Sequence, residues 1–147
     1  MIILDTNLLI YSIDLDSPHH KIASSWFERT LNGSELIGLP WIVLLAFLRI
    51  TTRAGVLQKP MTVEDAVSYC QSWLDLGSVR FLVPGRNHWP IFRNLLLSVG
   101  TAGNLTSDVH LAALALEHGC ALYSADNDFK RFPGITHVNP LADTLSI

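Results

Sequence analysis

Charged residues are scarce in this chain of 147 residues: Asp, Glu, Lys and Arg together make up 16% of it, against 49% for hydrophobic residues. So little polar material leaves an apolar patch exposed on the folded surface, where a second copy of the chain or a partner protein would cover it. The net charge of −3 argues against a broad cationic surface for nucleic acid, because such a surface must neutralise several phosphates. Any contact with nucleic acid is therefore expected to be local or to involve a metal ion.

Long apolar runs and secretion signals are missing as well. The longest apolar stretch, residues 36–48, is interrupted by Gly38 and Pro40 and is shorter than the roughly 20 residues that span a bilayer. The N-terminus lacks the basic start, apolar core and cleavage site of a secretory signal. We therefore expect a cytoplasmic protein without a membrane segment. Cys70 and Cys120 lack the Cys-x-x-Cys spacing, which favours two reduced, buried thiols.

Short apolar runs alternate with amphipathic stretches along the chain. Strands are predicted at residues 2–4, 35–39, 79–83, 121–124 and 136–139. Helices are predicted at residues 8–13, 17–31, 41–53, 62–76, 89–99 and 109–118, with one helical turn in the loop 126–132. Ser17-Pro18 indicates an N-cap with proline in the first turn, and Pro40 is expected to break the second strand. The alternation predicts an α/β fold, with one domain over residues 1–147 and a central, mostly parallel sheet flanked by helices.

Three aspartates stand where an apolar strand ends or a helix begins. Asp5 follows the first strand, Asp126 follows the strand at 121–124, and Asp108 precedes the helix at 109–118. Ligands of open α/β sheets collect outside the carboxyl ends of the strands. The sequence therefore predicts one acidic pocket built from Asp5, Asp108 and Asp126.

Each aspartate also has a simpler structural explanation. Asp5 is well placed to cap the helix that follows it. Asp108 gains from the helix dipole in a first turn, while Thr106 or Ser107 serves equally well as the cap and leaves its carboxylate free. Asp128, two residues after Asp126, fits an ordinary solvated turn.

The electrostatics of a carboxylate cluster favour a bound cation. Two carboxylates about 4 Å apart repel by about 4 kcal/mol at an effective dielectric of 20, so an unneutralised cluster would destabilise the fold. Hard oxygen ligands, without Cys or paired His at ligand spacing, indicate Mg²⁺ or Mn²⁺ rather than zinc. The pattern predicts a metal-bound active site.

The same segments resemble the PIN domain, and specifically the VapC toxin of VapBC toxin–antitoxin pairs. Three motifs carry the resemblance: Ile-Leu-Asp-Thr-Asn at residues 3–7, Thr-Ser-Asp-x-x-x-Ala-Ala-x-Ala at 106–115, and Ser-x-Asp-x-Asp-Phe at 124–129. They occur in the family's order and spacing, and the similarity extends over nearly the whole chain. Together they are quite specific, although each alone is not.

The resemblance implies a metal-dependent endoribonuclease that uses Mg²⁺ or Mn²⁺. It assigns the metal to Asp5, Asp108 and Asp126, with Asp128 at the edge of the site. Hydrogen bonds from the supporting residues would hold these carboxylates; the supporting residues are Thr6, Asn7 and Ser124. It further implies an RNA substrate cut to 5′-phosphate and 3′-hydroxyl ends, a VapB-like antitoxin as partner, and a homodimer.

One position departs from the family pattern. The family usually carries a Glu in the helix after the second strand, just before an apolar pair and an Arg. Here the segment is Ala46-Phe47-Leu48-Arg49, and no acidic residue occurs between Glu35 and Glu64. The expected number of bound metals is therefore one or two.

Basic and aromatic residues supply weaker predictions. Arg49 and Arg53 lie four apart, a spacing that would direct both toward the pocket to bind RNA phosphates or an antitoxin carboxylate, or place both on a solvated helix edge. Three other residues are weaker RNA contacts and are expected at the surface: Arg86, His88 and Arg93. His110 is expected on the other side of its helix from Asp108, in the core or an interface. Four tryptophans are expected to pack in the core or cover a dimer surface: Trp26, Trp41, Trp73 and Trp89.

Two other functions are compatible with parts of the pattern. With Ala46 in place of Glu, the chain would serve as a PIN-like module that binds RNA or a partner protein and cleaves poorly. Phosphatases of the haloacid dehalogenase type also place an Asp after the first strand. They need a second Asp two residues later, where this chain has Asn7.

Overall fold

Five parallel strands form the sheet of the protein in a computed structural model that describes residues 1–142. Their spatial order is β3-β2-β1-β4-β5, and each neighbouring pair is parallel. The strands are β1 Ile2–Leu4, β2 Ile37–Pro40, β3 Val79–Leu82, β4 Ala121–Tyr123 and β5 His137–Val138. The predicted α/β class with a central parallel sheet is confirmed.

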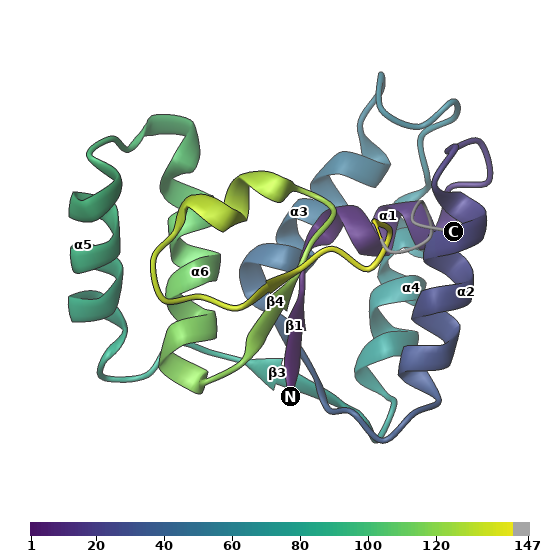
Figure 1. Ribbon diagram of the computed structural model, residues 1–147. Coiled ribbons are helices and arrows are strands. Elements are labelled where there is room, and N and C mark those ends of the chain that lie inside the picture. Colours follow the sequence, from purple (N-terminus) through teal and green to yellow (C-terminus); the bar gives the residue numbers. More distant parts are fainter. Residues whose placement is uncertain (143–147) are drawn as a thin grey trace.

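Helices cover both faces of this sheet. They are α1 Thr6–Ile13, α2 His20–Leu31, α3 Trp41–Thr52, α4 Val63–Leu74, α5 His88–Val99 and α6 Thr106–His118, with 3₁₀ turns η1 Gly103–Leu105 and η2 Asn127–Arg131. Figure 1 shows α5 and α6 on one side of the strands and α2 and α4 on the other. Residues of β1 are buried, as expected for a central strand between two helical layers.

The direction of winding reverses beside β1. The chain passes from β1 outward to β2 and β3, and then returns to the other side of β1 to form β4 and β5. Leu4 pairs with Tyr123 at the carboxyl ends of β1 and β4, and the backbone amide of Asp5 donates to the carbonyl of Tyr123 at 2.9 Å. Such a reversal leaves a crevice at the strand ends, where ligands of α/β proteins bind.

Aromatic packing fixes the orientation of α3. Phe47 is fully buried and contacts the ring of Trp73 from α4 edge-on, with centroids 4.9 Å apart. Because Phe47 faces the core, Ala46 and Arg49 are carried round the helix to the crevice beside β1. The packing of α3 therefore decides which of its side chains reach the candidate site.

Three local predictions were wrong. Pro40 does not break β2 but is its last residue; its extended backbone (φ −81°, ψ 160°) also makes it the N-cap of α3. Ser17 and Pro18 precede α2 in a turn in which the hydroxyl of Ser17 accepts from the amide of His19. Neither Thr106 nor Ser107 caps α6, which was the third error. The helix begins at Thr106 without a side-chain cap, because a 3₁₀ turn leads directly into it.

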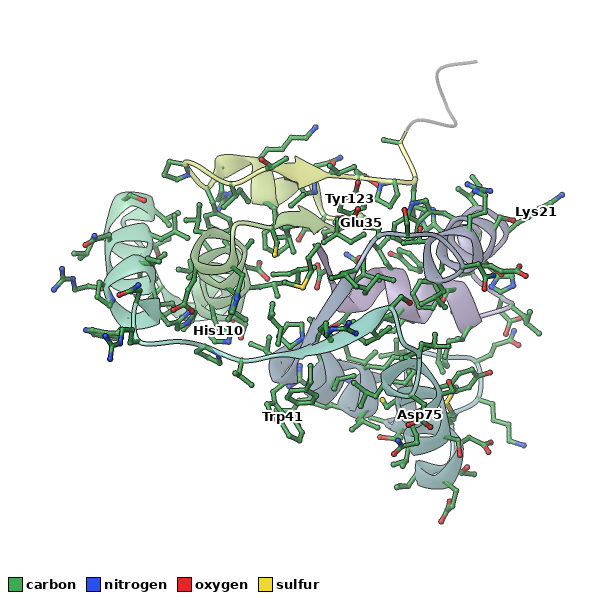
Figure 2. The ribbon with its side chains drawn as sticks, turned by 90° about the horizontal axis from the view of Figure 1, so that it is seen from below. Lys21, Glu35, Trp41, Asp75, His110 and Tyr123 are labelled. Carbon is green, nitrogen blue, oxygen red and sulfur yellow. The ribbon has the colours of Figure 1, made fainter. Side chains whose placement is uncertain are left out.

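Both cysteines are free and buried, as predicted. Across residues 1–142, helices long and apolar enough to cross a membrane are absent. Two tryptophans do not pack in the core, and for them that expectation was wrong: Trp41 is 58% exposed and Trp89 is 65% exposed. Figure 2 shows the side chain of Trp41 projecting away from the ribbon, and its ring contacts Phe81 of the edge strand β3.

Candidate active site

Asp5 is held through both of its carboxylate oxygens. It is the N-cap of α1, where Oδ1 accepts from the backbone amide of Thr6 at 2.7 Å. Its Oδ2 accepts from the hydroxyl of Ser124 at 2.7 Å. Burial raises the pKa of Asp5, while the hydrogen bonds from Ser124 and Thr6 lower it and the charge of Asp126 raises it. Asp5 therefore both caps α1 and contributes its carboxylate to the candidate site.

Ser124 joins the segments that follow β1 and β4. Its side chain is fully buried, and besides donating to Asp5 its Oγ accepts from Nδ2 of Asn7 at 3.2 Å and from the amide of Asp126 at 3.0 Å. Oδ1 of Asn7 accepts from the amide of Ala125 at 3.3 Å. This closed network fixes the orientation of the Asp5 carboxylate.

Asp108 is the acidic residue of the first turn of α6. Burial raises its pKa to about 6, with further increases from the charges of Asp5, Asp126 and Asp128. A lowering contribution comes from Arg131. The predicted aspartates are thus close enough to repel one another, as a shared acidic site requires.

A pocket of about 290 Å³ brings part of the predicted set together. Its polar lining comes from Asp5, Thr6, Asn7, Arg49, Ser107 and Asp108. Its apolar wall comes from Ile10, Ile42, Val43, Ala46, Ile50 and Leu111. We call this space the acidic pocket. Of its two carboxylates, Asp5 directly follows β1 and Asp108 lies in the first turn of α6, more than a hundred residues later in the chain.

Other predicted residues lie outside this lining. Asp126 is half-buried and its Oδ1 accepts from the amide of Asp128 at 2.9 Å, capping the η2 turn. Asp128 is exposed, consistent with a solvated turn. Arg53 is exposed and has extended backbone just past the end of α3. Because α3 ends before Arg53, the four-residue spacing does not place Arg53 on the same helix face as Arg49.

Ala46 lines the acidic pocket, so a longer side chain at this position would enter the space beside Asp5 and Asp108. The family pattern places its missing Glu at this position. The methyl group of Ala46 carries no oxygen, so this side of the pocket provides no ligand for a cation. The departure seen in the sequence therefore lies in the candidate site itself.

The donors of the pocket suit a hard divalent cation of limited protein coordination. Within residues 1–142, groups of three or more His, Cys, Asp or Glu side chains arranged to hold one ion are absent. Mg²⁺ usually keeps several waters and binds through one or two carboxylates together with substrate phosphates. Asp5 and Asp108 provide that number, so the donor set fits Mg²⁺ and does not form a complete protein cage.

Two residues near the carboxylates were missed by sequence reasoning. Arg131, at the end of η2, lowers the pKa of Asp108 through its positive charge. His137 of β5 places Nε2 3.0 Å from the carbonyl oxygen of Ser124. Its charge lowers the pKa of Asp5. Neither stands in a motif, since their approach depends on how β5 and η2 fold over β4.

A family model of the PIN domain matches residues 2–135, which is most of the chain. The chain belongs to the PIN-domain family. Its relatives include Ribonuclease VapC33 of Mycobacterium tuberculosis, 41% identical over 97% of this chain and 100% of the relative. Ribonuclease VapC37 of the same organism is 39% identical over 97% of this chain and 99% of the relative. This PIN domain is therefore similar along its length to VapC ribonucleases, as the sequence motifs predicted.

Solved structures show the same fold. The VapBC2 complex of Rickettsia felis bound to a DNA fragment of its promoter contains a chain with a TM-score of 0.70 and 21% identity, covering 95% of this PIN domain and 98% of that chain. Mycobacterium tuberculosis VapC20, a toxin that cleaves the sarcin–ricin loop, has a TM-score of 0.66 and 16% identity, covering 92% and 99%. At these identities the likeness concerns the fold alone.

Proposed function

We propose that this PIN-domain protein is a VapC-type endoribonuclease, the toxin of a type II toxin–antitoxin pair, which hydrolyses RNA phosphodiester bonds in the cytoplasm. The proposal treats residues 1–147 as one PIN-like domain. The observation that supports it best is the meeting of Asp5 and Asp108 in one pocket with Arg49. This happens in a chain 41% identical to Ribonuclease VapC33.

A divalent cation, Mg²⁺ or Mn²⁺, would be held by Asp5 and Asp108, with Asp126 and Asp128 adding negative charge from the η2 side. When bound, such a cation neutralises charge on a phosphoryl group and makes water a better nucleophile. The Asp5 carboxylate is ready for this role because the hydroxyl of Ser124 and the amide of Thr6 fix both of its oxygens.

Arg49 would supply the remaining charge for the substrate. It is exposed and lines the acidic pocket, where its guanidinium group suits a phosphate of the RNA backbone or a carboxylate of an antitoxin. Both groups are anionic. An antitoxin segment in the pocket would therefore compete directly with RNA.

The proposed partners are a VapB-like antitoxin and a second copy of the chain. Support comes from apolar side chains of α3 and the edge strand β3 that stay exposed: Trp41 is 58% exposed, Leu45 54% and Phe81 40%. Removing such side chains from water is the main gain in protein association. A homodimer or an antitoxin complex would cover them.

A second candidate function rests on Ala46. With an alanine in the pocket wall, the domain would bind RNA or a partner protein and cleave weakly or not at all. The phosphatase alternative is weakened by Asn7, whose amide bonds to Ser124 and Ala125 and is thus part of the scaffold around Asp5.

Cleavage of RNA by the purified protein tests the proposal. We expect wild type to cut RNA with Mg²⁺ or Mn²⁺ and to stop with a chelator, and Asp5→Asn to be inactive. Asp16→Asn is the matched control, because Asp16 is exposed and is not part of the pocket lining. Wild type that binds RNA without cutting it would instead support the binding module. Hydrolysis of a phosphomonoester without RNA cleavage would support the phosphatase.

A further inference from the structure

A second pocket, of about 450 Å³, opens beside the acidic pocket. It is lined by Ile42, His88, Trp89, Phe92, Thr106, Ser107 and His110. We call it the aromatic pocket. Ile42 and Ser107 line both pockets. The two pockets are therefore adjacent, and one extended molecule can occupy both.

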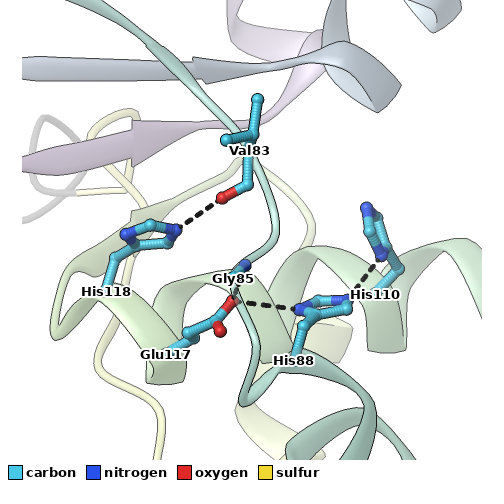
Figure 3. Close-up of polar contacts among 6 residues, drawn as sticks. All are labelled: Val83, Gly85, His88, His110, Glu117 and His118. Carbon is cyan, nitrogen blue, oxygen red and sulfur yellow. Dashed lines mark hydrogen bonds and ion pairs between the residues drawn. The ribbon is translucent and has the colours of Figure 1, made fainter.

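Polar contacts between α6 and the segment that leads into α5 hold His88, which lines the aromatic pocket, in place (Figure 3). Oε1 of Glu117 accepts from the amide of Gly85 at 2.9 Å and lies 3.4 Å from Nδ1 of His88. A side chain at Gly85 would make this carboxylate shift, since a Cβ there would lie 2.8 Å from its Oε2. His118 contacts the carbonyl of Val83 at 2.9 Å through Nε2. The first turn of α5 is therefore anchored in place.

His110 lines this pocket. Its Nδ1 lies 2.9 Å from Nε2 of His88, whose other nitrogen faces Glu117. A carboxylate next to Nδ1 of His88 favours a proton on that nitrogen, so in the neutral pair Nε2 of His88 accepts and Nδ1 of His110 donates. Nε2 of His110 is then an acceptor, and Figure 3 shows it directed away from His88.

The lining favours a flat, uncharged ligand. Among the described residues 1–142, the lining includes no Asp, Glu, Lys or Arg, which argues against a phosphate or a charged peptide group. Trp89 is 65% exposed and contacts Phe92, with ring centroids 5.8 Å apart. Exposed aromatic rings of this kind are the surfaces on which proteins stack the unpaired bases of single-stranded RNA.

We propose that the aromatic pocket is a nucleobase subsite for the RNA strand whose phosphate lies in the acidic pocket. Trp89 stacks on the base, and Nε2 of His110 accepts a hydrogen bond from an N–H group on the base edge. This inference rests on the proposed ribonuclease function. It adds that the base next to the cleaved bond is recognised by α5 and α6.

Binding is tested without catalysis, by following the imidazole resonances of the wild-type protein by NMR in metal-free buffer. The probes are adenosine, guanosine, cytidine and uridine 5′-monophosphates, with ribose 5-phosphate as the probe that lacks a base. We expect the resonances of His88 and His110 to shift with at least one nucleotide and not with ribose 5-phosphate. Absence of any nucleotide-dependent shift overturns the subsite.

Cleavage provides the second test, with short RNAs in which one nucleotide at a time is replaced by an abasic analogue. Trp89→Ala should lower kcat/KM on intact RNA by roughly 5- to 150-fold and should abolish the penalty at one abasic position. Trp89→Phe should restore most of the loss, because it keeps a stacking ring. Leu97→Ala is the matched control, because Leu97 lies on the same helix, is 72% exposed and is outside the lining of both pockets.

The outcomes separate the subsite from the ribonuclease proposal. Wild type that fails to cut any RNA overturns the ribonuclease proposal and with it the subsite, whatever the NMR titration shows. Wild type that cuts RNA while Trp89→Ala behaves like Leu97→Ala overturns only the subsite. Loss of a dimer in Trp89→Ala, without a change at any abasic position, would assign the pocket to the contact between two copies.

Discussion

Ser124 donates a hydrogen bond of 2.7 Å to Oδ2 of Asp5 across 119 positions of sequence. The bond joins the ends of β1 and β4, where the winding of the sheet reverses. Because Ser124 also accepts from Asn7 and from the amide of Asp126, one hydroxyl connects most of the polar groups behind the acidic pocket.

Ser124→Ala removes this connection. We expect metal affinity to fall about 10- to 100-fold, as for other groups that orient a metal ligand. The free energy of unfolding should fall by about 1–3 kcal/mol, since buried partners lose their hydrogen bonds. Calorimetric titration with Mn²⁺ and urea denaturation measure the two effects. Ser72→Ala, at an exposed serine, is the control; an equal effect from it would contradict the role given to Ser124.

The raised pKa of Asp108 predicts a pH-dependent stability in the absence of metal. With a pKa of about 6, the folded protein holds this proton more tightly than the unfolded chain does. The contribution of Asp108 to the free energy of unfolding is therefore present below about pH 4 and is lost as pH rises through about 6. Asp108→Asn should thus be more stable than wild type at pH 7, by about 1 kcal/mol because solvent screens a half-buried carboxylate.

Urea denaturation in chelator at several values between pH 4 and pH 7 checks this prediction. The stability gain of Asp108→Asn should vanish near the lower end of the range. Asp16→Asn, at an exposed aspartate, should show little difference from wild type throughout. Equal stability of Asp108→Asn and wild type at pH 7 would be incompatible with a carboxylate destabilised by burial and its acidic neighbours.

Ala46→Glu restores a carboxylate to the wall of the acidic pocket. We expect Mn²⁺ to bind about tenfold more tightly, since affinity for hard cations rises with the number of charged oxygen ligands. Without metal the melting temperature should fall, because the added charge repels Asp5 and Asp108. Leu45→Glu is the control, on the same helix but 54% exposed and outside the pocket lining. Equal Mn²⁺ affinity in the two variants would exclude position 46 from the metal site.

Arg49→Ala should weaken RNA binding more than Arg53→Ala does. Only Arg49 lines the acidic pocket, although both residues are exposed. Loss of one phosphate contact should raise the Kd for RNA about three- to tenfold and reduce the slope of log affinity against log salt by about 1. Binding measured by fluorescence anisotropy at several salt concentrations gives both values. Matching losses in the two variants would indicate a diffuse charge effect instead of a contact in the pocket.

Much of the fold and part of the site followed from local patterns. Apolar runs alternating with amphipathic stretches predicted the parallel sheet, because strands buried on both faces need helices on each side. Thr62 caps α4 through the amide of Asp65, as its spacing indicated. Asp5 and Asp108 could be placed in one site because, in a parallel α/β fold, ligands collect outside the carboxyl ends of the strands, where residues just past a strand and at a helix start converge.

Tertiary packing decided the rest. The rotation of α3, set by Phe47 in the core, determines that Ala46 and Arg49 reach the acidic pocket. The contact between His88 and His110 joins two helices, and no spacing within either helix encodes it. Sequence fixes the period of each element and its caps, which depend on near neighbours. Which faces meet depends on how side chains of distant elements interlock, and only the folded chain specifies that.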